Sequence, residues 1–203
     1  MREVLRRAAP VLPAVFAVGA SFGVLARTAR FGSVAAVVMS MTTFAGSAQI
    51  ATVSLLGAGS TLGAAIAAAV LLNTRYGPIG ISVSRAFRGS VGRRFLEAQL
   101  VVDESWALSE GRRRLLVGIG GLLWVAWVGG TVAGVALGSV IGDPSTYGID
   151  GAFAALFVAL LATQVPSRRS ARVALVGAVV AAALVPFTPP GIPIVVATVA
   201  VLA

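Results

Sequence analysis

The sequence predicts an all-α polytopic membrane protein with about six or seven hydrophobic helices, two of them interrupted (broken or re-entrant). Hydrophobic residues make up 58% of the 203 residues, against about 45–50% in soluble domains. Charged residues account for only 11% and separate apolar runs, several near the ~20 residues that cross a bilayer. We expect one transmembrane domain over 1–203, with a motif-bearing half (1–84), a polar loop (85–114) and a C-terminal helical half (115–203).

The first apolar run, Pro10–Ala26, follows a cluster of arginines and in this respect resembles a signal peptide. Further apolar spans follow it, and Pro10 and Pro13 open the run as prolines do at helix starts. A retained first helix is therefore the favoured interpretation.

The next two runs are interrupted. Ser33–Gly57 contains the small and polar stretch Phe44–Gln49, and Thr61–Ser84 contains Asn73–Pro78. Breaks of this kind within apolar segments are typical of broken or re-entrant helices.

The second half of the chain is more regular. Arg85–Arg114 is the sizeable polar stretch, and Leu115–Ile141 is the clearest span because it carries no charge. Gly151–Val165 and Val173–Val185 are shorter, and Gly191–Ala203 is too short to cross alone unless it is extended or tilted.

Arginine counting predicts the orientation of the loops. Arg85–Arg114 is rich in arginine and should be cytoplasmic, whereas Gly142–Asp150 has acids but no arginine and should lie outside. Arginines at both ends of the first helix conflict with each other. Either the N-terminus is inside and a Ser33–Gly57 hairpin bent at Gly46 does not cross, or the N-terminus is outside and three full spans precede the polar loop.

Glycines at four-residue spacing predict close helix packing. They lie in the charge-free span and in two earlier runs: Gly130, Gly134, Gly138 and Gly142, then Gly19 and Gly23, and Gly59 and Gly63. Packing is favoured over substrate contact, and the partner helix belongs either to this chain or to another.

Composition excludes several functions. The net charge is +9 and all 16 basic residues are arginine, but they lie in short loops as the positive-inside rule requires, so we expect no nucleic-acid binding. The chain has no Cys and no His, which removes thiolate and imidazole metal sites, Cys nucleophiles and His bases. Without an enzyme motif, we expect no enzyme, catalytic residue, metal or cofactor.

The first break is a candidate substrate site, because transporters bind solutes at broken helices. Small residues around Gly46 allow a ligand close to the backbone, Ser47 suits the N-cap of the next half-helix, and Gln49 offers an amide. The alternative is a tight helix crossing in which Ser47 and Gln49 bond to neighbouring helices.

The second break contains Asn73 and Arg75. An arginine flanked by apolar runs is costly in lipid and is a candidate to bind a carboxylate. The structural alternatives are an ion pair with Asp103 or Glu104, or an arginine that reaches the membrane surface. The two acids would gate, pair with Arg75 or take a proton; the simpler interpretation is a solvated helix that starts near Asp103.

Taken in order, these motifs resemble the AzlC family of branched-chain amino-acid permeases over residues 10–110. The matching stretches are Phe22–Ala26, Met39-Ser40, Phe44–Gln49, Asn73-x-Arg75 and Asp103–Leu108. The resemblance implies a multi-pass protein of the bacterial plasma membrane that exports valine, leucine and isoleucine with a small hydrophobic AzlD-type subunit. Members often have a His where this chain has Tyr76, so no coupling role is implied at that position.

The residues and the resemblance agree on one mechanism. The carboxylate site would use the two breaks, namely Gly46, Ser47, Asn73 and Arg75. Asp103 or Glu104 would take the ammonium or a coupling proton, and Met39 and Phe44 would line an apolar pocket. The alternative is a non-transporting membrane scaffold in which the glycines bind a partner and the breaks are packing features.

Overall fold

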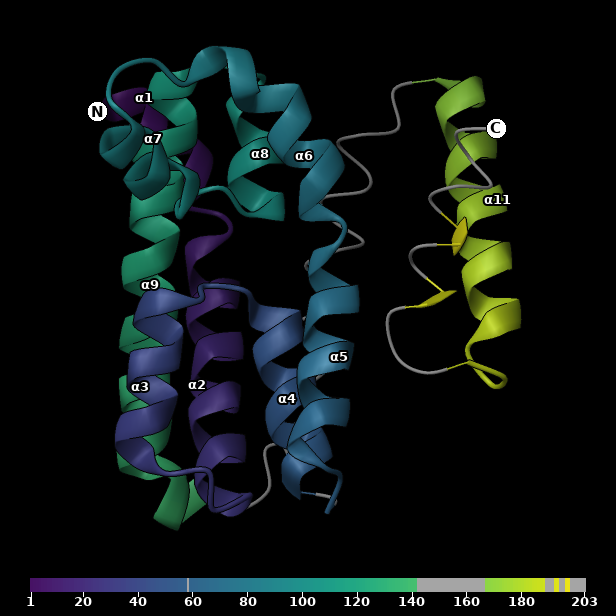
Figure 1. The fold of residues 1–203 in the computed structure, drawn as a ribbon. Coiled ribbons are helices and arrows are strands. Elements are labelled where there is room, and N and C mark those ends of the chain that lie inside the picture. The colour runs from purple at the N-terminus through teal and green to yellow at the C-terminus, as the bar shows by residue number, and fades with distance from the viewer. Residues whose placement is uncertain (58, 142–166, 189–191, 194–195, 198–203) are drawn as a thin grey trace.

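The computed structural model describes residues 1–57, 59–141, 167–188, 192–193 and 196–197. Within these residues all regular secondary structure is helical, which agrees with the predicted fold class (Figure 1). In chain order the helices are α1 (Arg2–Ala8), α2 (Leu12–Thr28), α3 (Ser33–Thr42), α4 (Gly46–Gly57), α5 (Leu62–Asn73), α6 (Tyr76–Val83), η1 (Ser84–Ala86), α7 (Val91–Ala98), α8 (Asp103–Ser109), α9 (Arg113–Ile141) and α11 (Arg168–Leu184).

Helices α2 and α9 run side by side in the same direction (Figure 1) and share the most extensive contact between the described helices. They approach closely because glycines meet backbone: a Cβ on Gly134 would collide with the carbonyl of Ala20, and one on Gly23 with the carbonyl of Thr131. The packing interpretation of this glycine ridge is confirmed, and its partner helix is in this chain.

The other predicted glycines divide into two groups. Gly19 also meets the α9 backbone, at Trp127, and so belongs to the same contact. Gly59 and Gly63 have no described neighbour within 4 Å of where a Cβ would stand. Gly142 lies outside the described residues.

Helices α3 and α4 form a hairpin that enters and leaves at one end of the molecule (Figure 1). The chain reverses at Thr43–Ala45, immediately before the predicted bend at Gly46. At the open end of the hairpin, opposite the turn, Gly57 packs against Ala29, which directly follows α2. The hairpin does not cross the bundle, so the N-terminus and Arg85–Arg114 lie at the same end, as in the first of the two predicted topologies.

The predicted break at Asn73–Pro78 is slight. Helix α5 ends at Asn73, and the N–H of Gly77 bonds to the carbonyl of Thr74 at 3.0 Å, a tighter turn than in an α-helix. Pro78 has no N–H for that carbonyl, which explains the local change. The helix direction continues, and Leu62–Ala86 counts as one 25-residue candidate span.

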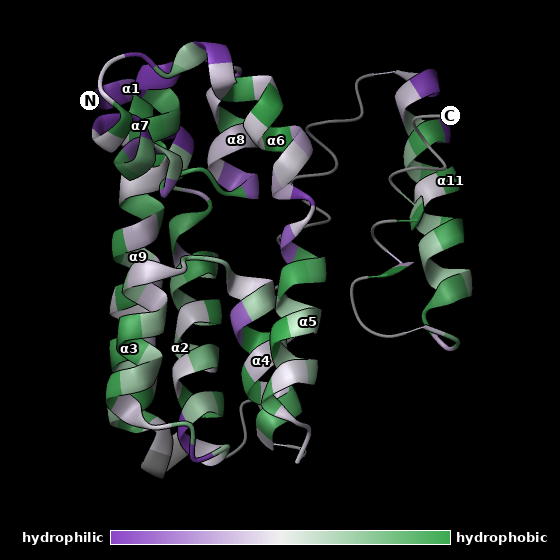
Figure 2. Cartoon of the chain, in the orientation of Figure 1, coloured by the Kyte–Doolittle hydropathy of each residue, from purple (hydrophilic) through white to green (hydrophobic). Residues whose placement is uncertain are grey.

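Ion pairs hold the N-terminus and the polar segment together. Arg7 lies 2.8 Å from Glu110, and Arg112 lies 2.7 Å from Glu3. Hydrophilic residues gather at this end, whereas hydrophobic residues dominate along the bundle (Figure 2). The predicted polar loop is therefore an arginine-rich cap that contains α7 and α8.

The span count is lower than predicted. Within the described residues, Leu62–Ala86 and Arg113–Gly138 are long and apolar enough to cross a membrane, and α1 with α2 makes a third if their 58° bend lies within one span. One reason is that Ser33–Gly57 folds back as helices of 10 and 12 residues. Helix α11, which includes most of the predicted Val173–Val185 span, has 17 residues and none of them is buried.

The remaining predicted spans cannot be compared with the structure. Gly151–Val165 and most of Gly191–Ala203 lie outside the described residues.

Candidate functional site

The turn of the hairpin is held by Gln49. Its Oε1 accepts a hydrogen bond from the N–H of Ala45 at 3.2 Å, and its Nε2 donates to the Oγ of Ser40 at 3.1 Å. Gln49 is fully buried and lines neither of the two cavities described below. In the structure this predicted substrate residue bonds within its own hairpin.

Ser40 joins the hairpin to α9. Its Oγ accepts from the indole Nε1 of Trp127 at 3.1 Å and lies 2.8 Å from the Oγ1 of Thr131. A Cβ on Gly46 would stand 2.9 Å from the Trp127 ring, so a glycine is needed for this approach. The start of α4 is thus fixed against α9.

Arg75 connects three parts of the fold. Its Nη2 lies 3.0 Å from the Oδ2 of Asp103 and donates to the Oγ of Ser47 at 2.8 Å. Its guanidinium carbon is 5.3 Å from the centre of the Tyr76 ring, within the range of a cation–π contact. The side chains of Arg75 and Asp103 are only 17% and 20% exposed, so each neutralises the other in a mostly buried position.

The inner cavity surrounds this ion pair and has a volume of about 30 Å³. Its polar wall consists of Ser47, Arg75, Asp103 and Glu104. The remaining lining is mostly apolar: Val15, Val18, Phe44, Gly46, Tyr76, Val102, Leu123 and Trp127. A space of this size holds about one water molecule, so a larger ligand enters only if the walls move.

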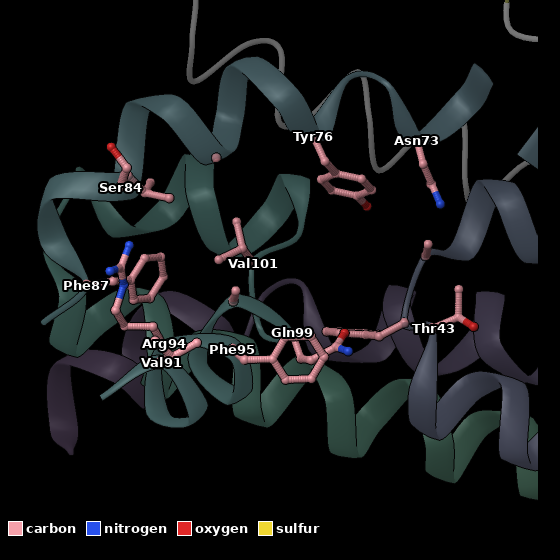
Figure 3. Close-up of a pocket in the computed structure, with 15 residues that line it drawn as sticks. Thr43, Asn73, Tyr76, Ser84, Phe87, Val91, Arg94, Phe95, Gln99 and Val101 are labelled. Atoms are coloured by element: carbon pink, nitrogen blue, oxygen red, sulfur yellow. The ribbon is translucent and has the colours of Figure 1, made fainter. Parts of the chain in front are cut away.

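The vestibule is a second cavity of about 580 Å³, between the hairpin turn and the arginine-rich end (Figure 3). It is lined by Thr43, Phe44, Ala45, Asn73, Tyr76, Gly80, Val83, Ser84, Phe87, Val91, Arg94, Phe95, Ala98, Gln99 and Val101. Pockets for small molecules usually have about 300–1,000 Å³, so this one can hold an amino acid.

The structure brings most predicted site residues together. The inner cavity is lined by Phe44, Gly46, Ser47, Arg75, Asp103 and Glu104, and Asn73 lines the vestibule. Met39 packs against the hydrophobic core and lines neither cavity.

Helix α8 begins at Asp103 as predicted, but it is not a solvated helix. Ser105 in its first turn is fully buried, and Asp103 pairs with Arg75.

Sequence analysis missed Tyr76 and Trp127 as wall residues. Two signals in the sequence could have identified them. Tyr76 directly follows an arginine within an apolar segment, and the indole N–H of Trp127 lies in a charge-free span, where a buried N–H needs a hydrogen-bond acceptor.

Comparison with known proteins gives a consistent result. The sequence model of the AzlC protein family matches residues 10–141. An uncharacterized membrane protein of Archaeoglobus fulgidus is 35% identical over 181 residues, which cover 86% of this chain and 80% of the relative. No solved structure matches the chain.

Proposed function

The chain belongs to the AzlC family of membrane proteins, and from this premise we propose that it is the transporting subunit of a branched-chain amino-acid exporter. Its substrates are valine, leucine, isoleucine or similar small amino acids. It works in the bacterial plasma membrane with a small hydrophobic AzlD-type subunit.

The observation that carries the proposal is the ion pair of Arg75 and Asp103 at the inner cavity. A zwitterionic amino acid has the same two charges. Its carboxylate replaces Asp103 on Arg75 and Ser47, and its ammonium binds Asp103 or Glu104. When the ammonium binds Asp103, one internal ion pair is exchanged for two with the solute, and Asp103 keeps a partner in a poorly solvated site.

The first turn of α4 supports the carboxylate end of this site. The first N–H groups of a helix have no partner within the helix, and the helix dipole favours an anion there. Arg75 donates to Ser47 in this turn. A carboxylate on Arg75 therefore lies close to the start of α4, as expected for a broken helix in a transporter.

The apolar walls suit an aliphatic side chain. Val15, Val18, Leu123 and Phe44 face the inner cavity and offer no hydrogen-bonding group to a polar side chain. The cavity must expand to admit valine, so the structure corresponds to a closed inner site beside an open vestibule.

The distribution of arginine supports export. The arginine-rich end faces the cytoplasm by the positive-inside rule. Residues of η1 and α7, such as Ser84 and Arg94, bring the vestibule to that end. Cytoplasmic amino acids therefore reach the vestibule before the inner site, an arrangement compatible with export.

The outer face of α5 and α6 is the surface proposed for the small subunit. Val70 and Ile81 are 60% and 78% exposed, and a Cβ on Gly63 or Gly77 would meet nothing described within 4 Å. Small and apolar residues of this kind let a second transmembrane helix approach closely. The remaining apolar surface contacts lipid.

The test is efflux of radiolabelled valine, leucine and isoleucine from cells that express the chain with its candidate small subunit. Wild type should accelerate efflux, and Arg75→Ala should abolish the acceleration. Arg75→Lys should retain part of it, because the positive charge remains but the planar guanidinium that binds a carboxylate through two hydrogen bonds is lost. The exposed Arg88→Ala is the matched control and should transport normally.

Three outcomes would count against the proposal. Unchanged efflux with wild type in the membrane would refute the substrate assignment. Normal efflux by Arg75→Ala would refute the carboxylate site. Assembly of the small subunit without any solute flux would favour the scaffold alternative.

A further inference from the structure

The vestibule and the inner cavity meet at two aromatic side chains. Among the described residues, Phe44 and Tyr76 are the ones that line both cavities. Phe44 comes from the hairpin turn and Tyr76 from the start of α6. We propose that these two side chains form the gate between the vestibule and the inner site. The identity of the solute rests on the proposed function, but the gate does not.

Phe44 is the fixed side of the gate. Its backbone has a φ of 42°, in the left-handed region that non-glycine residues rarely adopt, and its side chain is only 6% exposed. The turn is kept in this conformation by the bond from Ala45 N–H to Gln49 and by the bond from Thr43 N–H to the Met39 carbonyl. Strained residues held by their surroundings are typical of functional positions.

Tyr76 is the moving side. It lines the large vestibule together with Gly80, and a Cβ on Gly80 would meet nothing described within 4 Å. The ring therefore has free volume on the vestibule side, as the view in Figure 3 shows. On the other side the guanidinium carbon of Arg75 lies 5.3 Å from the ring centre, and the hydroxyl interacts with Arg75 and Asp103. When a solute carboxylate draws Arg75 away from this position, the cation–π contact weakens and the ring is released.

The two rings also explain selection for apolar solutes. Apart from the Tyr76 hydroxyl, these two side chains offer water and ions no hydrogen-bonding group at the junction of the cavities. A solute with an aliphatic side chain contacts both rings as it passes, whereas a charged side chain would lose its hydration without a partner.

The chain has no Cys, so single thiols report access to each cavity. Gln99→Cys reports on the vestibule, and Ser47→Cys and Val18→Cys report on the inner cavity; Val18 is not a partner of Arg75 in any described contact. The measurement is the rate of labelling by a charged methanethiosulfonate reagent on the purified chain with its small subunit, without amino acid.

The gate predicts a specific set of rates. Access behind a gate is reduced by the fraction of time that it is open, so the inner thiols should react at least ~10-fold more slowly than Gln99→Cys. Phe44→Ala or Tyr76→Ala should raise the inner rates by at least ~10-fold and leave the Gln99→Cys rate unchanged. Tyr76→Phe removes the hydroxyl that contacts Asp103 and Arg75 but keeps the ring, so it should raise the inner rates much less than Tyr76→Ala.

Phe95→Ala is the matched control, because Phe95 lines the vestibule but not the inner cavity. The proposal is overturned if inner and vestibule thiols react equally fast in the parent, or if Phe95→Ala opens the inner site as much as Phe44→Ala. If Phe44→Ala does not purify as a single species, the labelling rates of Tyr76→Ala alone test the gate. Because no solute is present, failure of the gate and failure of the transport proposal are separate results.

Discussion

The guanidinium of Arg75 and the carboxylate of Asp103 lie 3.0 Å apart, although they belong to different segments of the bundle. Arg75 lies between α5 and α6, and Asp103 begins α8 in the arginine-rich end. The pair therefore ties a candidate span to the polar cap. In the proposed transport mechanism a zwitterionic solute takes the same positions, so its binding would break the pair.

Neutralising one member of this pair should destabilise the protein more than neutralising both. Asp103→Asn or Arg75→Gln leaves a mostly buried charge alone, and we expect each to cost roughly 1–3 kcal/mol, between the values for exposed and fully buried pairs. The double variant leaves no lone charge, so it should cost less than either single variant and therefore less than their sum. The measurement is the apparent Tm in detergent.

The exposed Arg88→Gln is the control for loss of an arginine and should change stability by less than about 0.5 kcal/mol. Additive effects of the two single substitutions would show that the pair does not contribute to stability.

The contact of Gly134 with Ala20 should tolerate no side chain. Gly134→Ala places a methyl group on the Ala20 carbonyl and forces α2 and α9 apart, which should cost about 1–3 kcal/mol. Gly121→Ala on the same helix meets nothing described within 4 Å, so it should be neutral or gain up to about 1 kcal/mol of helix propensity. Equal apparent Tm values for the two variants would contradict the packing.

Local signals in the sequence were sufficient to predict the helical membrane class, the glycine packing and the first break. Gly46 and Ser47 interrupt an apolar run, and a backbone break at that depth is costly unless protein surrounds it. The turn itself lies at Thr43–Ala45, because Phe44 adopts a left-handed conformation. Its side chain type gives no hint of this, since the conformation depends on contacts with distant residues.

Long-range pairing could not be predicted. The sequence left Arg75 with three interpretations, because a partner for a buried charge is chosen by the fold and not by spacing. Hydropathy also overstated the number of spans: an apolar hairpin such as Ser33–Gly57 has the same composition as a crossing helix. Only the direction in which α4 leaves the turn distinguishes a hairpin from a crossing helix.

Gln49 should act on the hairpin and not directly on a solute. Gln49→Leu keeps the size of the side chain but leaves the buried N–H of Ala45 without its acceptor, which should cost about 1–3 kcal/mol. Hydrogen exchange should become faster at the turn, Thr43–Ala45. The exposed Gln99→Leu is the matched control and should leave exchange at the turn unchanged. Weaker valine binding with unchanged stability and exchange would instead make Gln49 a solute ligand.

The ion pairs of Glu97 with Arg113 and with Arg93 should contribute to stability, and this contribution should be lost only in acid. Hydrogen bonds from Arg113 and then Arg93 hold the pKa of the Glu97 carboxyl below its usual range. Because the folded protein binds this proton more weakly, the contribution is complete above the unfolded pKa of about 4.3 and disappears as pH falls through the lower folded pKa. Glu97→Gln lacks the charge at every pH.

The apparent Tm of wild type and Glu97→Gln, measured from pH 8 to pH 3, isolates this carboxylate because all other acids are shared. The difference should stay constant from pH 8 to about pH 5 and shrink below about pH 4. A difference that shrinks near neutral pH would mean that the folded pKa is raised, and the two arginines would then not be its partners in solution. A difference near zero throughout would mean that α7 is not tied to α9 by this residue.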